Sequence, residues 1–359
     1  MIDEDIFFMK KAITLAEKAR GYTYPNPLVG AVLVKEGSII GEGYHSKYGN
    51  PHAEYVAIIA AKSNTKNSTM YVTVEPCVHF GKTPPCVDKI IKAGIKRVVI
   101  GMKDPNPRVN GKGIERLRKA GIKVKTGVLE KEILKQNEAY VKFIQKSIPF
   151  VVVKIAMSID GKIALSSGES RWITQEKARV FAHKLRSESQ AVLVGINTVL
   201  KDDPLLDARL VKGRDPIKVV LDAFLQIPEN ARLLNKGKTL IFTKEDTKIS
   251  KKLRNAEIIK VKALNGFLSL SEILKELGRK KVVQLLVEGG GTVISSFLKE
   301  RLVDKIIFII NPSIIGNGID FAKDLKIKDL NKRIRLQNVE MRRINEDIIV
   351  EGYPVYRYN

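Results

Sequence analysis

The residues best suited to chemistry lie early in the chain, at His52, Glu54, Cys77 and Cys86. One imidazole and two thiolates could bind a zinc ion and leave its fourth tetrahedral position open to water, as in catalytic zinc sites. Zinc lowers the pKa of a bound water towards about 7, which makes a nucleophile available at neutral pH. Glu54 is placed to take the proton of that water and to return it to a ring nitrogen and a leaving amine.

The order of these residues resembles the signature of zinc deaminases that act on nucleobases, in which the glutamate of His-x-Glu is not a ligand. The second cysteine of that signature usually follows the first after two residues, whereas residues 78–85 separate Cys77 from Cys86 here. Taken singly, a histidine or a cysteine is more often structural. Together, the four residues predict a zinc-dependent hydrolytic deaminase.

The longer spacing between the cysteines is the pattern of the bifunctional deaminase/reductase family of riboflavin biosynthesis, which the sequence resembles over roughly its whole length. Several further motifs carry the resemblance, in the order expected of that family: Pro25-Asn26-Pro27, Val29-Gly30-Ala31, Asp104-Pro105-Asn106-Pro107, Gly111-Lys112-Gly113 and Gly195-Ile196-Asn197-Thr198-Val199. The resemblance implies deamination of 2,5-diamino-6-ribosylamino-4(3H)-pyrimidinone 5′-phosphate. Reduction of the ribosyl group to ribityl by NADPH would follow.

In the deaminase half, the resemblance implies four substrate contacts: Asn26, His45, His79 and Lys82. An asparagine amide can bond the edge of a pyrimidine ring, and a lysine offers a point charge to a phosphate. On local sequence alone, Asn26 could equally be a turn residue between prolines and Lys82 a solvated loop residue.

In the second half, the resemblance implies an NADPH-dependent reductase. The implied substrate contacts are Ser170, Arg186, Leu206, Arg209 and Glu288, and the implied cofactor contacts are Met157, Trp172, Thr198, Asp202, Gly290, Gly291 and Thr292. Lys154 is a candidate for proton delivery. The glycine cluster follows an expected strand and precedes an expected helix, where backbone amides can approach a pyrophosphate. Two positions depart from the family pattern, Gln190 and Ala223.

Hydrophobic periodicity predicts an N-terminal layered α/β sheet. The expected helices cover residues 3–20, 53–62, 84–93 and 113–120, and the expected strands cover residues 28–34, 38–43, 70–74, 97–100 and 122–126. The first two strands should form a hairpin that turns at Glu36-Gly37.

A polar segment at residues 145–149 precedes an apolar run at 150–153, so we place the domain boundary there: a zinc deaminase domain at residues 1–146 and a reductase domain at 147–359. Further strands are expected at residues 191–194, 218–221, 239–242, 257–261, 282–287 and 305–310. The fold class is therefore α/β in both halves. The resemblance implies a cytidine-deaminase-like first domain and a dihydrofolate-reductase-like second domain.

Composition and charge limit the location and the classes of binding partner that we expect for the protein. The first 20 residues lack a secretory pattern, and no apolar stretch of 18 residues occurs, so we expect a cytoplasmic protein that does not enter a membrane. The net charge of +24 would suit nucleic acid, but the basic residues are scattered without a dense run, so phosphorylated small molecules are the favoured partners. A nucleic-acid-editing deaminase is the main alternative and a zinc-stabilised binding protein a weaker one. A homo-oligomer remains open.

Overall fold

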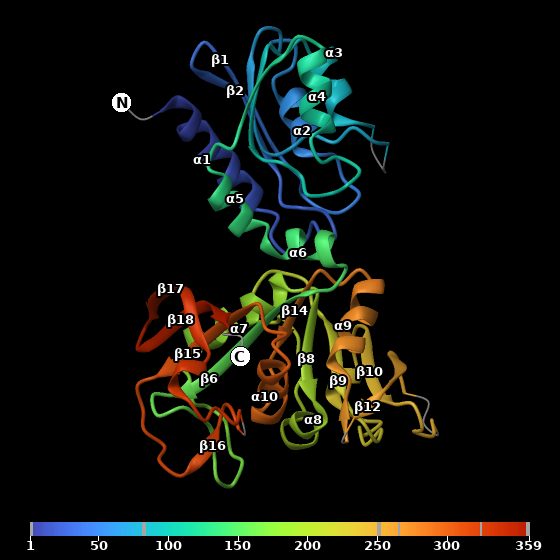
Figure 1. Cartoon of the computed structure of the whole chain (residues 1–359), viewed down its shortest axis with the longest axis vertical. Helices are drawn as coiled ribbons and strands as arrows, with labels where there is room; N and C mark the ends of the chain where they lie inside the picture. The colour runs from blue at the N-terminus through green and yellow to red at the C-terminus, as the bar shows by residue number, and fades with distance from the viewer. Residues whose placement is uncertain (1–2, 81–83, 250–252, 265, 324, 357–359) are drawn as a thin grey trace. The chain divides into compact units, whose positions relative to one another are not determined.

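The protein divides into two compact units, Met1–Ser147 and Ile148–Asn359. The computed structural model describes residues 3–80, 84–249, 253–264, 266–323 and 325–356 (Figure 1). Each unit has its own sheet with helices packed against it, so the α/β class predicted for both halves is confirmed.

The first unit contains a five-stranded sheet in the order β2-β1-β3-β4-β5. β1 runs antiparallel to β2 and β3, and β3, β4 and β5 are parallel to one another. Glu36 and Gly37 connect β1 to β2 with φ angles of 50° and 73°, as a tight two-residue hairpin turn requires. The strand bounds are β1 Gly30–Lys35, β2 Ser38–Tyr44, β3 Thr69–Val74, β4 Arg97–Met102 and β5 Lys123–Thr126.

Helices cover both faces of this sheet. α1 (Glu4–Glu17) and α5 (Glu130–Gln136) bury apolar side chains such as Met9 and Ile133 against one face, and α6 (Glu138–Lys146) follows. The other face carries the helices that bring the functional residues: α2 (Ala53–Ala60), α3 (Cys86–Lys92) and α4 (Lys112–Lys119). Apolar residues recur every three or four positions on these helices, which gives each one a buried stripe.

The second unit is built on a nine-stranded sheet in the order β11-β10-β9-β8-β14-β6-β15-β18-β17. The strands from β11 to β15 are parallel, and β18 and β17 complete one edge in antiparallel fashion. The bounds are β6 Phe150–Ser158, β8 Ala191–Gly195, β9 Ile217–Leu221, β10 Thr239–Lys244, β11 Ala256–Val261, β14 Gln284–Val287, β15 Lys305–Asn311, β17 Arg335–Ile344 and β18 Asp347–Val355.

Four helices accompany this sheet: α7 (Glu176–Glu188), α8 (Ile196–Asp202), α9 (Leu270–Arg279) and α10 (Gly291–Lys299). α9 and α10 bury Leu274 and Phe297 in the main core. α8 begins directly after β8, and α10 begins four residues after β14 ends. Ligands of open parallel sheets gather at such carboxyl ends, so this edge is where a site is expected.

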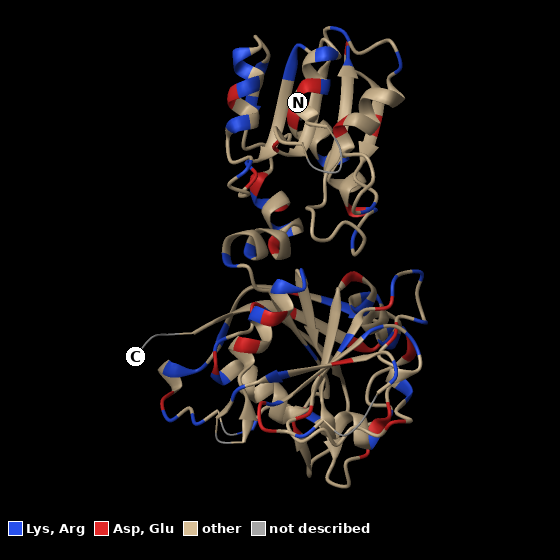
Figure 2. Cartoon of the chain, turned by 90° about the vertical axis from the view of Figure 1, so that its right-hand side faces the viewer, with Lys and Arg blue, Asp and Glu red and all other residues tan. Residues whose placement is uncertain are grey.

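Several short elements were not predicted. They are β7 Lys162–Leu165, which pairs with β16 Gly318–Asp320, β12 Ala263–Leu264, which pairs with β13 Phe267–Leu268, and the single turns Arg232–Leu234 and Leu330–Lys332. Figure 2 shows basic and acidic residues intermixed along both units in that view. Within the described ranges, no helix combines the length and apolarity that crossing a membrane would need.

Candidate active sites

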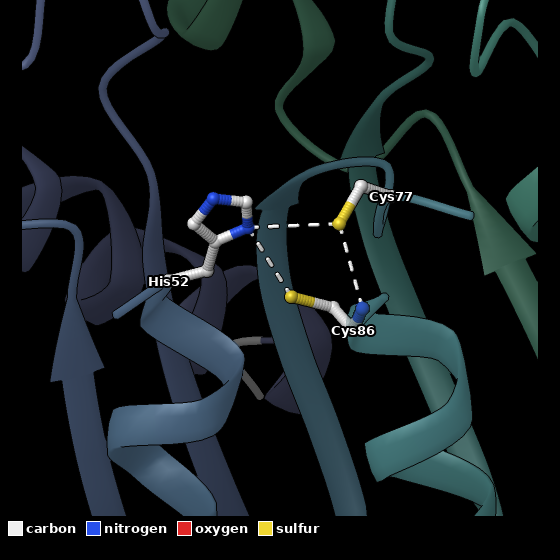
Figure 3. Close-up of side chains that lie close together, drawn as sticks. All are labelled: His52, Cys77 and Cys86. Carbon is white, nitrogen blue, oxygen red and sulfur yellow. Dashed lines mark hydrogen bonds between the residues drawn. The ribbon is translucent and has the colours of Figure 1, made fainter. Parts of the chain in front are cut away.

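His52, Cys77 and Cys86 converge in the first unit (Figure 3). The ligand atoms of the three residues all lie within 4.8 Å of one another. Nδ1 of His52 is 3.6 Å from Sγ of Cys77 and 3.3 Å from Sγ of Cys86. A tetrahedral zinc ion with bonds of about 2.0 Å to nitrogen and about 2.3 Å to sulfur separates its ligand atoms by roughly 3.5 Å, so these donors fit zinc.

The starts of two helices and the end of one strand position the three donors. His52 is the residue that precedes α2, Cys86 is the first residue of α3, and Cys77 follows β3 after two further residues. The backbone N–H of Cys86 donates to Sγ of Cys77 over 3.4 Å. Hydrogen bonding by the thiol of Cys86 and by His52 lowers the pKa of the Cys77 thiol to about 4, although burial opposes the shift. Cys77 is therefore held as a thiolate, the form that binds metals.

Glu54 lies in the first turn of α2, beside this cluster and not within it. Its side chain is 3% exposed, and burial raises the pKa of its carboxyl group. Among the residues that the structure describes, none donates a hydrogen bond to its Oε2. A buried carboxyl group with a raised pKa and an unpaired oxygen is suited to accept and release protons.

Glu75, at the end of β3, anchors the loop that carries Cys77. Its Oε1 accepts hydrogen bonds from the backbone N–H groups of Gly113 (2.9 Å) and Ile114 (3.2 Å). Its Oε2 accepts from those of Gly111 (2.9 Å) and Asp104 (3.3 Å). A single buried carboxylate thus joins the metal-ligand loop to the start of α4 and to the Asp104 loop, both recognised in the sequence only as motifs.

Two of the expected deaminase substrate contacts lie together next to the donors. His45 Nδ1 is 3.2 Å from the carbonyl oxygen of Pro51, which can only accept, so this nitrogen carries the proton. His45 Nε2 then accepts from Asn26 Nδ2 at 3.1 Å, and the ring of His45 lies edge-on to that of His52, with centroids 5.2 Å apart. Burial lowers the pKa of His45, which favours this neutral form.

The other two expected contacts, His79 and Lys82, come between the two cysteines in the sequence. His79 is half-buried, and its Nδ1 has no hydrogen-bond partner among the described residues. Lys82 falls outside the residues that the structure describes.

The second unit contains a cavity of about 900 Å³ at the carboxyl ends of β8, β9 and β14. Its size is at the upper end of that found for ligand sites. Most of the reductase residues expected from the sequence line it: Lys154, Ser170, Trp172, Arg186, Thr198, Asp202, Leu206, Arg209, Glu288, Gly290, Gly291 and Thr292. Residues far apart in the sequence therefore meet around one space.

A cluster of buried, oppositely charged side chains forms one wall of the cavity. Arg186 donates from Nε and Nη2 to the two carboxylate oxygens of Glu288 at 2.7 and 2.9 Å, and Lys154 Nζ lies 3.1 Å from Oε2. Burial alone would raise the pKa of Glu288, but Arg186 and Lys154 outweigh it and hold the pKa well below its usual range. Glu288 is therefore ionised at neutral pH.

The glycine cluster lies where a cofactor phosphate could approach the backbone. Gly290 immediately precedes α10, and a Cβ atom built on Gly290 would meet nothing within 4 Å, so this position opens onto the cavity. A Cβ atom on Gly291 would instead come within 2.6 Å of the carbonyl oxygen of Asp320. The N-terminus of α10 can therefore receive an anionic group, which fits a dinucleotide pyrophosphate.

Met157 is the one expected cofactor contact in this unit that the cavity does not include. It lies in the core cluster with Val153 and Ile155, whereas its neighbours Lys154, Ile155 and Ala156 on β6 line the cavity. The cavity therefore ends one residue before Met157 on this strand.

The two departures from the family pattern have different positions. Gln190 bonds the backbone of Lys281 and Val283 and does not line the cavity, whereas Ala223 does line it. Sequence reasoning did not identify many of the other lining residues, among them His183, Phe224 and Phe267. No local signal in the sequence distinguishes them, because residues distant along the chain create the cavity.

Comparison with known proteins agrees with this geometry. A family profile described as the RibD C-terminal domain matches residues 149–350, and one described as the cytidine and deoxycytidylate deaminase zinc-binding region matches residues 2–102. The chain is 45% identical to the riboflavin biosynthesis protein RibD of Aquifex aeolicus over 346 residues, covering 96% of each chain. It is 37% identical to RibD of Escherichia coli over 327 residues, covering 88% of this chain and 89% of the relative.

Solved structures agree over nearly the full length. The Thermotoga maritima diaminohydroxyphosphoribosylaminopyrimidine deaminase/5-amino-6-(5-phosphoribosylamino)uracil reductase superposes with a TM-score of 0.88 at 40% identity, covering 98% of this chain and 99% of its own. RibD of Acinetobacter baumannii, in one crystal form, gives a TM-score of 0.89 at 33% identity with the same coverage. The similarity extends through the second half, which a nucleic-acid-editing deaminase would leave unexplained. The chain therefore belongs to the RibD family of riboflavin biosynthesis proteins, enzymes that join a zinc-binding deaminase domain to an NADPH-dependent reductase domain.

Proposed function

We propose that residues 1–146 deaminate 2,5-diamino-6-ribosylamino-4(3H)-pyrimidinone 5′-phosphate and that residues 147–359 then reduce its ribosyl group, giving 5-amino-6-(5-phosphoribitylamino)uracil. The observation that carries the proposal is the convergence of His52, Cys77 and Cys86 beside the buried carboxyl group of Glu54. The cavity of the second unit supports the reductase step, because charged side chains line one wall and the N-terminus of α10 opens onto it.

In the deaminase, His52, Cys77 and Cys86 hold the metal. Zinc, when bound, supplies Lewis-acid activation of water. Glu54 accepts the proton of that water and delivers it to the ring nitrogen and then to the leaving amine, so that C–NH₂ and water become C=O and ammonia. Burial of the carboxyl group keeps its proton affinity high enough for the return step.

Asn26 and His45 orient the pyrimidine in this proposal. Because Nδ1 of His45 donates to Pro51, its Nε2 must accept from the amide nitrogen of Asn26. That bond fixes the amide, so Oδ1 of Asn26 remains as an acceptor for a ring N–H or an exocyclic amine. His79 and Lys82, which come between the two cysteines in the sequence, complete the proposed set of substrate contacts.

In the reductase, NADPH when bound would supply a hydride to C1′ of the sugar, and the ring oxygen would take up a proton as the C1′–O bond of the sugar ring breaks. Lys154 is the proposed proton donor, because its ammonium group is held 3.1 Å from Glu288 at the cavity wall. Ser170, Arg186, Leu206, Arg209 and Glu288 are the proposed substrate contacts. The proposed cofactor contacts are Met157, Trp172, Thr198, Asp202, Gly290, Gly291 and Thr292, and all of these except Met157 line the cavity.

Two assays on the full-length enzyme test this assignment. Ammonia release should require the diamino pyrimidine substrate and zinc, but not NADPH. NADPH oxidation, measured by absorbance with the already deaminated substrate, should survive removal of zinc by a chelator, because hydride transfer needs no metal-activated water. Loss of both activities on chelation would contradict two separate sites, and absence of ammonia release from the zinc-loaded enzyme would contradict the deaminase assignment.

A further inference from the structure

One histidine of the reductase cavity has no role in the function proposed so far. His183 lies in α7, is 6% exposed and borders the cavity. Its Nδ1 is buried and has no hydrogen-bond partner among the described residues. Buried polar atoms almost always have a partner in the protein or in a bound molecule, so a bound molecule could supply the partner that the described residues do not.

The surroundings of His183 are cationic. Arg186 lies one turn further along α7 on the same face, and Arg209 also acts electrostatically on the imidazole. Burial first, and then these two guanidinium groups, lower the pKa of His183 to about 4, while Asp207 and Glu288 oppose the shift. The imidazole is therefore neutral at pH 7, and in the tautomer that carries its proton on Nδ1 it offers an N–H donor beside the two arginines, which line the same cavity.

Neither arginine is fully occupied by the protein. Arg186 uses Nε and Nη2 for Glu288 and Nη1 for the carbonyl oxygen of Asp207, which leaves one N–H on each terminal nitrogen. Arg209 pairs with Asp207, and its side chain is 50% exposed, so it can turn towards a ligand. Two guanidinium groups and an imidazole N–H that border one cavity match an anion with several acceptor oxygens.

We propose that His183 is a third ligand, together with Arg186 and Arg209, of the 5′-phosphate on the sugar of the reductase substrate. This inference rests on the proposed reduction of a ribose 5-phosphate derivative and adds a residue that determines its specificity. The phosphate is the best match, because it supplies both the acceptor that the N–H lacks and the negative charge that two neighbouring guanidinium groups favour. A sugar hydroxyl would supply only the acceptor.

A thermodynamic cycle that combines one change in the enzyme with one change in the substrate tests the contact between His183 and the phosphate. The value of kcat/KM for NADPH oxidation is measured with the deaminated substrate and with the same compound lacking its 5′-phosphate, in wild type and in His183→Leu. If His183 binds the phosphate, the variant should lose about tenfold or more on the phosphorylated compound and little on the other, since a hydrogen bond to a charged group has that value. His183→Gln, which keeps a donor, should recover part of the preference.

Inorganic phosphate gives a second readout that does not depend on turnover. Its dissociation constant, measured by calorimetry, should rise about tenfold in His183→Leu and stay unchanged in Lys184→Gln. Lys184 is the matched control, because it is the next residue of α7, its side chain is 62% exposed, and it does not line the cavity.

The outcomes distinguish failure of the His183–phosphate contact from failure of the proposed reductase function. Equal losses on both substrates would place His183 against the ribose or the pyrimidine and overturn the phosphate contact. A large fall in the melting temperature of His183→Leu, with a phosphate preference in His183→Gln no higher than in His183→Leu, would assign the residue to packing and also overturn the phosphate contact. Failure of the wild type to oxidise NADPH with either compound would instead refute the proposed reductase function.

Discussion

Replacing Glu54 by glutamine removes a group that can carry a proton and preserves the shape of the side chain. Loss of a general acid/base group typically slows a reaction by about 10²–10⁴-fold, which corresponds to about 3–5 kcal/mol of transition-state stabilisation. We expect this variant to lie in that range for ammonia release, because the carboxyl group is 3% exposed and water cannot easily substitute for it. The reductase should be unaffected.

Zinc content decides between a proton carrier and a ligand. Glu54 is not among the three residues whose donor atoms cluster, so Glu54→Gln should retain about one zinc per chain by metal analysis. Its melting temperature should not fall, because a neutral amide is cheaper to bury than a carboxylate. Glu42→Gln, on the exposed face of β2, is the matched control and should keep full activity. A zinc-free Glu54→Gln, or one that releases ammonia at the wild-type rate, would refute this reasoning.

Three further predictions concern the metal, the cofactor and a charged cluster. Cys86→Ser should lose both zinc and ammonia release while it keeps NADPH oxidation; metal retained at the wild-type level would contradict its role as a ligand. Gly290→Val should fold normally but weaken NADPH binding in fluorescence titrations, since its side chain would point into open space, whereas Gly291→Val should lower the melting temperature by meeting Asp320. Asp5 bonds Arg97 and Lys125, and these contacts hold the pKa of its carboxyl group well below its usual range. The stability that Asp5 contributes is therefore present above the unfolded pKa of about 4 and is lost as the pH falls. Asp5→Asn should cost about 1–3 kcal/mol at pH 7, and calorimetry should find a smaller difference from wild type near pH 3; an equal difference at both would argue against an ionic origin.

The sequence predicts the cluster of His52, Cys77 and Cys86 because these residues are close in the chain and chemically distinctive. His52 and Glu54 share one helix start, and the two cysteines flank one loop. Strands with buried apolar runs, such as β3, β4 and β8, are equally clear, since their pattern differs sharply from that of the loops around them.

Elements without such a pattern escape prediction. β17 is an edge strand whose side chains are almost all exposed, so its sequence carries no apolar alternation. His183 appears in the sequence as an ordinary helix residue, and only the distant strands β8 and β14 make its position a cavity wall. On β6, Ala156 lines the cavity and the next residue, Met157, lies in the core cluster, a difference that the sequence motif does not define.

The four hydrogen bonds that Glu75 accepts also bear on how the enzyme acquires its metal. They hold the Cys77 loop against the start of α4 through contacts that belong to the protein alone, so the donor atoms can be in register before an ion arrives. In a zinc finger, by contrast, the free energy of metal binding is the free energy of folding. Here the sheet and its two faces of helices bury a core of their own, and the metal can enter a finished scaffold. The protein can therefore stay folded while one divalent ion is exchanged for another or is removed by a chelator. Its reductase can then remain active while its deaminase is without zinc.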